Sequence, residues 1–417
     1  MSEIVIQGGR RLEGELHIAG SKNAILPIIA ATLLCRSTTY LYNCPRISDV
    51  ELMIKILKQL GCKIMWDEKV LMIDTSTLDS CDVPADLVNQ MRSSIILLGA
   101  ILGRCKEAKI GMPGGCQLGK RPIDLHLDAL RKMQVDISQQ EDFIHCKTLN
   151  LQGAHINLTL PSVGATENIM LAGACAKGTT TIDNAAREPE IVDLQNFLNA
   201  CGAKISGAGT KQIIIHGVEA LNGTNYRVIP DRIVAGTYLV AGAITRGNVV
   251  LNDVYNRHLG ATINKLRAIG CNVREEKNKV ILTVAKPLKG IVLKTEVYPG
   301  FPTDMQSQFV TLLTTCNGIS HVKENIFESR FKAANELRKL GAHIIVNEET
   351  QIATIHPTPY LKGTEVDATD LRGGAALVLA GLIAEGTTVV KNAHHIQRGY
   401  EDIVRDLSIL GADVTYK

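Results

Sequence analysis

Apolar and polar positions along the chain repeat with a period of about 70 residues. The clearest mark of the repeat is a helix end of the form Leu-x-x-x-Gly, followed by a β-branched run that favours a strand. Because glycine takes a left-handed conformation without penalty, the closing glycine predicts a helix C-cap. Copies occur at 57–61, 198–202, 266–270, 337–341 and 407–411, with a degenerate copy at 130–134 that ends in Gln134. The pattern therefore predicts six repeats.

Each repeat is predicted to contain the same elements in the same order. An apolar helix rich in small residues is followed by a glycine turn, a β-rich stretch, an amphipathic helix that ends at the glycine, and a hairpin. Residues 171–182 and 379–390 are nearly interchangeable copies of one part of this pattern. We therefore expect an α/β fold built from six copies of one motif.

The ends of the chain indicate how the repeats are grouped. The last repeat stops one strand short, and residues 4–8 match residues 213–217, which close the third repeat. We infer that the N-terminal strands complete the sixth repeat. Residues 1–20 and 230–417 would then form one domain of three repeats, and residues 21–229 an inserted domain of three.

Two similar lobes of this kind would place a ligand in the cleft between them. The alternative is an open solenoid of six repeats. A solenoid is disfavoured because the sequence has no atypical polar repeat that would cap one of its ends.

Composition excludes several classes of partner. Lys plus Arg number 45 against 42 for Asp plus Glu, and aromatic residues make up 4% of the chain, so no nucleic-acid partner is expected. The 11 cysteines are scattered and never spaced as C-x-x-C, which suits a reducing cytoplasm better than a zinc site or a disulfide framework. The sequence has neither a signal-peptide pattern nor a long apolar run, so no membrane segment is expected.

The sequence also lacks the common nucleotide and metal motifs. Neither G-x-G-x-x-G after a strand nor G-x-x-x-x-G-K-[ST] occurs, which removes the Rossmann and P-loop interpretations. No H-E-x-x-H motif indicates a metal, and the adjacent His394 and His395 are expected to form a strand or turn pair. We predict no metal and no cofactor, and the sequence does not indicate an oligomeric state.

Polar residues occupy one equivalent position, at or just before the first helix of each repeat. They are Lys22, Arg92, Ser162, Arg232, Asp304 and Arg372, at spacings of 70, 70, 70, 72 and 68 residues. Unpaired amides and the helix dipole make a helix start favourable for an anion. Helix capping is the alternative role, and it explains Ser162 and Thr303 well. Capping does not explain Lys or Arg, which the dipole disfavours there, so the set predicts a small polyanionic ligand.

The second repeat is about four residues longer than its neighbours. The extra residues fall in 113–122, P-G-G-C-Q-L-G-K-R-P, where Cys116 stands near Lys120 and Arg121. Nearby positive charge lowers the pKa of a thiol, so Cys116 is a candidate acid or nucleophile near neutral pH. The other cysteines are expected to be packing residues.

Seven segments, in order along the chain, resemble those of the enolpyruvyl transferases that use a UDP-sugar acceptor. They are 14–27 (G-E-L-H-I-A-G-S-K-N-A-I-L-P), 113–126 (P-G-G-C-Q-L-G-K-R-P-I-D-L-H), 161–168 (P-S-V-G-A-T-E-N), 187–190 (R-E-P-E), 299–306 (P-G-F-P-T-D-M-Q), 370–372 (D-L-R) and 395–400 (H-I-Q-R-G-Y). The resemblance spans the chain. It implies the family's two-domain inside-out α/β barrel, with six βαβαββ repeat units, three in each domain.

The resemblance also implies a reaction. These enzymes transfer the enolpyruvyl group of phosphoenolpyruvate to the 3′-hydroxyl of UDP-N-acetylglucosamine and release phosphate, the first committed step of peptidoglycan synthesis. Addition is followed by elimination, so the site needs an acid at the methylene carbon, a base at the hydroxyl and cations around phosphate and carboxylate. Closure of a loop over both ligands is expected to exclude water.

Position within these segments implies a role for individual residues. Cys116 resembles the catalytic acid and Asp304 the base, and Lys22 is also expected to be catalytic. The implied phosphoenolpyruvate-binding residues are Lys22, Asn23, Arg121, Arg372 and Arg398. The implied UDP-N-acetylglucosamine-binding residues are Arg92, Arg121, Pro122, Ile123, Asp124, Leu125, Ser162, Val163, Gly164, Asp304 and Ile326.

The chain departs from the family's usual pattern at three places. Residues 330–333 read R-F-K-A and lack a usual histidine, Arg92 is followed by Ser-Ser, and Arg372 is followed by Gly-Gly. Two alternatives are a paralogue with altered rate or sugar preference, and a degenerate paralogue that binds a UDP-sugar and reports it to a partner. The sister transferase that acts on shikimate 3-phosphate is disfavoured, because it has no such loop cysteine. Segment 187–190 is either a surface turn or part of the site.

Overall fold

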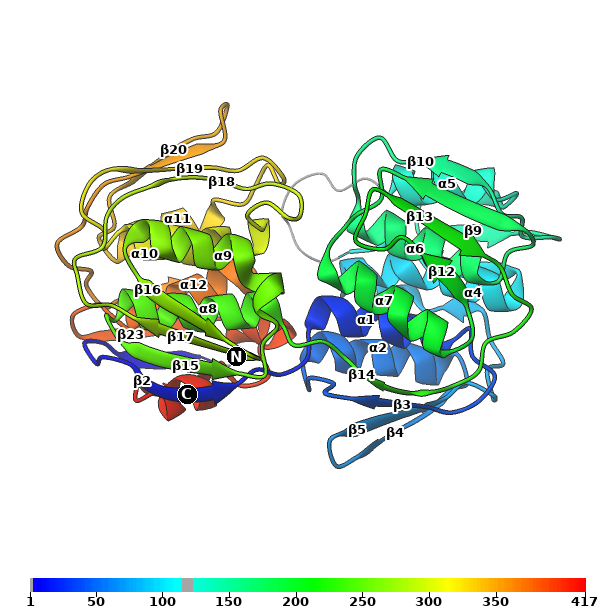
Figure 1. The fold of residues 1–417 in the computed structure, drawn as a ribbon, viewed down its shortest axis with the longest axis horizontal. Coiled ribbons are helices and arrows are strands. Elements are labelled where there is room, and N and C mark those ends of the chain that lie inside the picture. Colours follow the sequence, from blue (N-terminus) through cyan, green and yellow to red (C-terminus); the bar gives the residue numbers. More distant parts are fainter. Residues whose placement is uncertain (1–2, 115–122) are drawn as a thin grey trace. The chain divides into compact units, whose positions relative to one another are not determined.

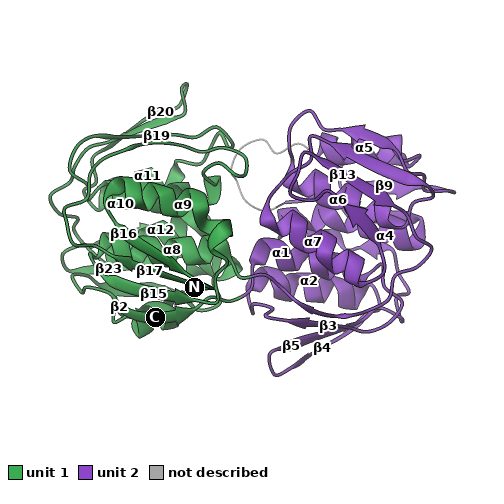
Figure 2. Cartoon of the chain, in the orientation of Figure 1, with its two compact units in different colours: residues 1–19, 117–120, 230–417 green, residues 20–116, 121–229 purple. Residues whose placement is uncertain are grey.

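The computed structural model describes all residues except 1–2 and 115–122. Contacts divide the described chain into two compact units (Figure 2). Unit 1 contains residues 3–19 and 230–417, and unit 2 contains the described residues of 20–229. Each unit has its own buried apolar core.

Unit 2 consists of the middle part of the chain. Its strands are β3 (Thr39–Tyr42), β4 (Lys63–Asp67), β5 (Val70–Asp74), β6 (Asp82–Val83), β7 (Glu107–Gly111), β8 (Asp136–Gln139), β9 (Phe143–Lys147), β10 (His155–Asn157), β11 (Thr179–Asp183), β12 (Lys204–Ser206), β13 (Gln212–His216) and β14 (Asn225–Arg227). Its helices are α1 (Lys22–Thr32), α2 (Ser48–Gln59), α3 (Ala85–Val88), the 3-10 helix η1 (Arg92–Ile96), α4 (Leu97–Cys105), α5 (Asp124–Lys132), α6 (Val163–Ala174) and α7 (Pro189–Ala200).

Unit 1 combines the two ends of the chain. Its strands are β1 (Ile4–Gln7), β2 (Glu13–His17), β15 (Asn248–Asn252), β16 (Asn272–Glu276), β17 (Lys279–Thr283), β18 (Val292–Lys294), β19 (Ser320–Lys323), β20 (Ile344–Asn347), β21 (Ile352–Ile355), β22 (Glu365–Asp367), β23 (Thr387–Lys391) and β24 (Asp413–Tyr416). Its helices are α8 (Arg232–Ile244), α9 (Asn256–Ile269), the 3-10 helix η2 (Thr303–Met305), α10 (Gln306–Leu313), α11 (Lys332–Lys339), α12 (Leu371–Gly381), the 3-10 helix η3 (Ala393–Arg398) and α13 (Ile403–Ile409).

The predicted repeat is confirmed at the level of the sheets. The described residues form six four-stranded sheets, three in each unit, and none of these sheets closes into a barrel. The sheet β18-β19-β21-β20 is typical: β18 pairs parallel with β19, and the hairpin of β20 and β21 pairs antiparallel with it. The chain from β18 to β21 therefore has βαβαββ connectivity, and within each unit the sheets lie outside and the helices inside (Figure 1).

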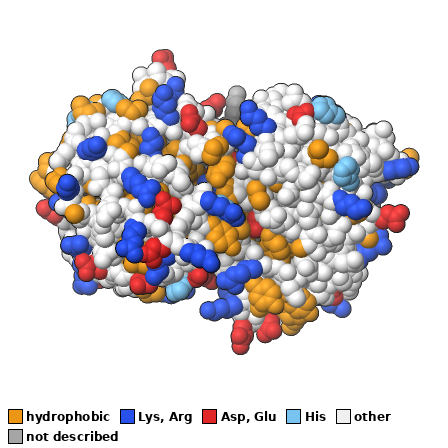
Figure 3. All heavy atoms as spheres, viewed as in Figure 1, with side chains coloured by type: hydrophobic (Ala, Val, Ile, Leu, Met, Phe, Trp, Pro, Cys, Tyr) orange, Lys and Arg blue, Asp and Glu red, His pale blue; other side chains and the backbone are white. Residues whose placement is uncertain are grey.

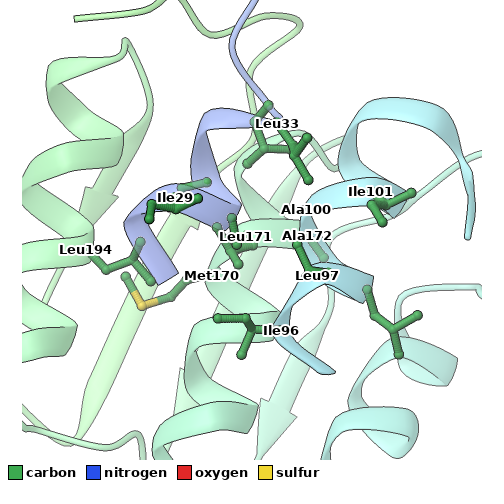
Figure 4. Close-up of a cluster of buried hydrophobic side chains, with 14 of the residues drawn as sticks. Ile29, Leu33, Ile96, Leu97, Ala100, Ile101, Met170, Leu171, Ala172 and Leu194 are labelled. Atoms are coloured by element: carbon green, nitrogen blue, oxygen red, sulfur yellow. The ribbon is translucent and has the colours of Figure 1, made fainter. Parts of the chain in front are cut away.

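The first helix of a repeat is buried on almost every side. All eleven residues of α12 and eleven of the thirteen residues of α8 are buried. A helix that is apolar all round must lie inside the fold, and its small residues let neighbouring helices approach closely. Figure 4 shows this packing in unit 2, where Ile29 of α1 and Leu33, its C-cap residue, lie in one cluster with Leu97 of α4 and Leu171 of α6.

The predicted left-handed helix ends are confirmed at all five closing glycines. The closing glycines Gly61, Gly202, Gly270, Gly341 and Gly411 have φ between 91° and 118°. Gln134, which replaces glycine in the degenerate copy, also has a positive φ of 64°. The backbone conformation is thus kept where its preferred residue is lost, at a cost in strain.

Strands that are distant in sequence close the sheets. β1 lies between β23 and β24, with Ile4 opposite both Val390 and Tyr416. β2 does not join β1 in the sheet of the last repeat but pairs parallel with β15, and β14 pairs parallel with β3. Unit 1 is therefore completed by two strands, β1 and β2, that precede unit 2 in the sequence, whereas in unit 2 the last strand, β14, pairs with the first, β3.

The surface carries charges of both signs. Figure 3 shows Lys and Arg side chains interspersed with Asp and Glu on the face in view. Among the described residues, no helix has both the length and the apolar character needed to cross a membrane. No group of three or more His, Cys, Asp or Glu side chains in the described part could hold a metal ion.

A buried carboxylate in unit 2 makes a pH-dependent contribution to stability. Tyr226 Oη donates to Asp193 Oδ1 at 2.6 Å, joining β14 to α7. Burial raises the pKa of Asp193 to about 6, although hydrogen bonds from Tyr226 and Ile229 oppose the rise. Since this pKa is above that of the unfolded chain, the stabilisation is complete below about pH 4 and is lost as the pH rises through 6.

Asp193→Asn keeps an oxygen acceptor for Tyr226 but cannot ionise. As the pH rises from 4 to 8, we expect the free energy of unfolding of the variant to increase relative to that of wild type, by at most roughly 3 kcal/mol. Urea titrations at both pH values measure this, with the exposed Asp142→Asn as control. A constant difference between the variant and wild type across this range would contradict the assignment.

Candidate active site

Lys22 is the first residue of α1 and is held by a carboxylate. Its Nζ lies 2.7 Å from Asp49 Oδ2 in the first turn of α2, and the two side chains are only 11% and 4% exposed. Ser21, at the N-cap, makes no side-chain capping hydrogen bond. A cation at a helix start is disfavoured by the dipole, and Asp49 offsets that penalty.

Arg92 and Asn23 lie at adjoining helix starts in unit 2. Arg92 begins η1, which contacts both α1 and α6, and Asn23 is the second residue of α1. Arg92 Nη1 donates to the carbonyl of Pro113 at 3.1 Å. Cys116, Arg121 and Pro122 lie in segment 115–122, outside the described residues.

The starts of α5 and α6 lie against each other. Ser162 caps α6 by accepting a hydrogen bond from the Ala165 amide at 3.3 Å, as the capping alternative predicted. Gly164 faces His126, because a Cβ added there would lie 3.1 Å from the ring. Asn168 Nδ2 lies 2.9 Å from His126 Nδ1. This packing brings residues 162–164 beside the helix that starts with Ile123, Asp124 and Leu125.

Asp304 in unit 1 lies between two buried arginines. Its Oδ1 accepts from Arg330 Nη2 and its Oδ2 from Arg372 Nη2, both at 3.0 Å. The two arginine side chains are 2% and 3% exposed, whereas the Asp304 side chain is 28% exposed. The carboxylate therefore remains partly open while both of its cations are enclosed.

Electrostatics keep Asp304 ionised. Burial alone raises the pKa of its carboxyl, but Arg372 and Arg330, with a smaller contribution from Arg232, outweigh burial and hold this pKa below its ordinary value. The same pairing raises the pKa of Arg372 against the effect of burial. Asp304 can accept a hydrogen bond at neutral pH, but in this arrangement it is a weak base.

Arg372 retains one buried donor. Its Nη1 is buried and has no hydrogen-bond partner of normal geometry among the described residues. Tyr400 lies close, with its ring centroid 5.9 Å from the guanidinium carbon. A buried donor of this kind is costly unless a ligand or water accepts from it.

Glycines after Arg372 let the helix bearing Arg398 approach. A Cβ on Gly374 would lie 2.8 Å from Ile396 of η3 and 2.9 Å from Ala368. Arg398 is the last residue of η3, which packs against α12. Gly374 is thus explained by the close contact between the elements that carry Arg372 and Arg398, whereas a Cβ on Gly373 would lie 2.7 Å from Asp370.

Glu324 joins Ile326, which was predicted to bind the acceptor, to Thr303, which precedes Asp304. Its Oε1 accepts from the amides of Ile326 and Phe327 at 2.8 and 3.1 Å, and its Oε2 accepts from Thr303 Oγ1 at 3.2 Å. The expectation that Thr303 caps a helix is wrong, because η2 has no side-chain cap and the Thr303 hydroxyl binds Glu324 instead.

The structure also places segment 187–190 and the pair His394 and His395, which the sequence singled out. Glu188 and Pro189 begin α7, and Glu190 is buried in its first turn. Burial, reinforced by Glu190 and Glu188, raises the pKa of Glu167 well above its ordinary value. His394 and His395 lie in the 3-10 helix η3, where their ring centroids are 4.2 Å apart, so they are not part of a strand.

Comparison with known proteins decides the family. A family model described as EPSP synthase (3-phosphoshikimate 1-carboxyvinyltransferase) matches residues 6–407. UDP-N-acetylglucosamine 1-carboxyvinyltransferase 2 of Caldanaerobacter subterraneus subsp. tengcongensis is 49% identical over 415 residues, which are 99% of each chain. The UDP-N-acetylglucosamine 1-carboxyvinyltransferase of Halothermothrix orenii is 45% identical over 414 residues, again 99% of each. The chain belongs to the UDP-N-acetylglucosamine 1-carboxyvinyltransferase family.

Solved structures agree on the fold of this family. The enolpyruvyl transferase NikO from Streptomyces tendae matches with a TM-score of 0.90 and 27% identity, covering 100% of this chain and 99% of that one. EPSP synthase from Acinetobacter baumannii matches with a TM-score of 0.74 and 21% identity over 100% of both chains. At 21% identity, the likeness to EPSP synthase shows the fold alone.

Sequence reasoning missed the partners of the predicted site residues. The repeat pattern gives no signal for three contacts: Lys22 with Asp49, Thr303 with Glu324, and Asp304 with Arg330. Each contact joins residues that are 21 to 27 positions apart in the sequence. In the sequence, Arg330 stood out only as the first residue of R-F-K-A (330–333), a segment that departs from the family's usual pattern. A search for charged residues near the starts of the second helices would have found Asp49 and Arg330.

Removal of the Asp304 charge should destabilise unit 1. Asp304→Asn leaves two buried guanidinium groups without their carboxylate, for which we expect a loss of about 3–5 kcal/mol in the free energy of unfolding. Asp128→Asn breaks an exposed pair with Arg131 and should cost less than about 1 kcal/mol. Equal losses in the two variants, measured by urea denaturation, would show that the buried pairs do not carry this stability.

Proposed function

We propose that this chain transfers the enolpyruvyl group of phosphoenolpyruvate to the 3′-hydroxyl of UDP-N-acetylglucosamine and releases phosphate. The observation that carries the proposal is 44–49% identity over nearly full length to several relatives, each named UDP-N-acetylglucosamine 1-carboxyvinyltransferase. The Asp304 cluster and the Lys22–Asp49 pair supply groups that this chemistry needs.

The reaction proceeds by addition and elimination. An acid protonates C3 of phosphoenolpyruvate, which makes C2 electrophilic, and the 3′-hydroxyl oxygen adds to C2 as its proton passes to a base. Loss of phosphate from the tetrahedral ketal, with removal of a proton from C3, restores the double bond. The proton gained at C3 is balanced by the proton lost, and no electron acceptor is required. We assign no metal or cofactor.

Asp304 is proposed as the base for the sugar hydroxyl. Its exposed edge can accept the hydroxyl hydrogen bond, but Arg330 and Arg372 weaken it as a base. An anionic substrate group that binds Arg372 Nη1 would compete for the same guanidinium. Asp304 would then be held less tightly, so its pKa and its basicity would rise in the loaded enzyme.

Cations are proposed to hold phosphoenolpyruvate. Lys22, Arg372 and Arg398 are assigned to its phosphate and carboxylate groups, together with Asn23 and Arg121. Asp49 would orient Lys22, because a lysine stem is flexible and one short ion pair fixes the position of its ammonium.

The UDP-sugar is proposed to lie along neighbouring helix starts. Ser162 is the N-cap of α6, and Val163 and Gly164 are its first two residues, so the positive end of the dipole of a long buried helix lies here, which suits a diphosphate. Arg92 and residues 121–125 are assigned to the same ligand, and Ile326, which is 36% exposed, is assigned to the sugar.

Cys116 is proposed as the acid at C3. Its glycine-rich segment and two nearby cations are the sequence features that support this role. The reaction would supply an early step of peptidoglycan synthesis, and we propose the cytoplasm as its location.

The choice of acceptor is tested by phosphate release from phosphoenolpyruvate. We expect release with UDP-N-acetylglucosamine, and at least a hundredfold less with shikimate 3-phosphate, because a site that pairs with a nucleotide diphosphate leaves polar groups unpaired with the smaller acceptor. Preference for shikimate 3-phosphate would replace the proposed function with that of the sister enzyme. Tight UDP-N-acetylglucosamine binding without any release would favour the degenerate paralogue.

Variants at Cys116 test the acid. Cys116→Ala should abolish phosphate release without changing the thermal unfolding midpoint, whereas Cys81→Ala, at a thiol away from the assigned site, should remain active. Cys116→Asp should keep activity but resist a thiol-alkylating epoxide analogue of phosphoenolpyruvate, because a carboxylic acid can deliver a proton yet is a poor target for alkylation. Full activity of Cys116→Ala would remove the assignment.

A further inference from the structure

Unit 1 contains a cavity of about 260 Å³ that the proposed reaction does not use. It lies between the start of α8, the first turns of α9 and segment 298–302, and α8 and α9 are in contact (Figure 1). Arg232, Arg257, His258, Gly260, Asn264 and Tyr298 are among its lining residues. Of these, only Arg232 belongs to the repeated set of helix-start residues.

The lining is cationic. It contains two arginines and no Asp or Glu. The nearest acids, Asp231, Glu296 and Asp304, adjoin lining residues but do not line the cavity. Arg232 contributes to the low pKa of Asp304, so part of its charge is balanced there, whereas Arg257 is exposed and donates from Nε to His258 Nε2 at 3.3 Å. The cavity therefore has a net positive surface.

His258 adds a neutral imidazole ring to the lining. Burial, together with Arg257 and Arg232, lowers the pKa of His258 to about 4, so its ring is neutral at pH 7. Because Nε2 accepts from Arg257, the ring proton must be on Nδ1. Nδ1 is buried and has no hydrogen-bond partner among the described residues. An unsatisfied buried N–H costs about 1–3 kcal/mol unless something accepts from it.

Gly260 has no side chain, although the packing around it would leave room for one. It lies within α9, and a Cβ added there would meet no atom within 4 Å. Glycine inside a helix costs roughly 1 kcal/mol relative to alanine. No neighbouring side chain or backbone explains that cost, whereas an occupant of the cavity would.

The helix itself favours the same kind of occupant. α9 is fourteen residues long, and its N-cap residue, Tyr255, makes no side-chain capping hydrogen bond. The positive end of its dipole thus adds to the two guanidinium groups that line the cavity.

We propose that this cavity binds a phosphate-bearing anion, with the Arg257 guanidinium as its principal donor, the His258 ring beside it and Gly260 providing room for the rest of the molecule. Its volume exceeds what a single small anion fills, since one water occupies about 30 Å³ of liquid. Free phosphate, which the proposed reaction releases, and the diphosphate of a nucleotide share the recognised chemistry. The site is distinct from the residues assigned to catalysis.

The test reads His258 directly. Side-chain NMR of the full chain, without phosphoenolpyruvate, follows the His258 ring while inorganic phosphate or UDP is added, with the signal assigned by His258→Gln. We expect the ring signal to shift and the pKa of His258 to rise, because a bound anion favours the protonated ring. A shift with inorganic phosphate supports a free-phosphate site, and a shift with UDP alone supports a nucleotide site.

Variants separate this cavity from other phosphate-binding residues. Arg257→Met should weaken the response at least tenfold, whereas Lys277→Met, which removes the same charge from the exposed β16–β17 turn, should leave it unchanged. Gly260→Met should fill the cavity and abolish the response, and Gly260→Ala should fold with equal or higher stability. The proposal is overturned if neither probe moves the His258 signal, or if Arg257→Met and Lys277→Met weaken it equally. Because no turnover is measured, these outcomes are independent of the proposed reaction.

Discussion

The first helix of every repeat is enclosed along its length, and this constraint determines where polar chemistry can occur. Helices such as α8 and α12 offer almost no exposed face, so only their ends can meet a ligand. The N-terminal end has unpaired amides and a positive dipole. The residues of the proposed site accordingly gather at helix starts, where the repeat brings a polar side chain about every 70 positions.

At these starts, several cations are already paired with carboxylates. Asp49 holds Lys22, and Asp304 holds both Arg330 and Arg372. Such pairing orders flexible side chains before a ligand arrives, but it also means that an anionic substrate must compete with a resident carboxylate. In the proposed site, binding of the anion and the release of Asp304 would be coupled, because Arg372 cannot give its full charge to both.

The repeat could be predicted from the sequence because the signals that mark it are local. Leu-x-x-x-Gly marks a helix end and its left-handed cap, and small apolar runs mark the enclosed helices. Long-range partners were not predictable in the same way. Helix capping was the alternative role for Thr303, but the distant carboxylate of Glu324 binds its hydroxyl. The pairing of β2 with β15 and of β14 with β3 was also missed, because β14 has three residues and no distinctive pattern.

The position of β1 between β23 and β24 has a consequence for synthesis on the ribosome. Unit 2 is complete in sequence by residue 229, so it can fold while the remaining half of the chain is still being made. Ile4 and Ile6, by contrast, are fully buried only when the final strand has emerged. The earliest-made strand is therefore the last to find its neighbours, and an apolar, aggregation-prone segment remains unprotected for almost the whole of translation.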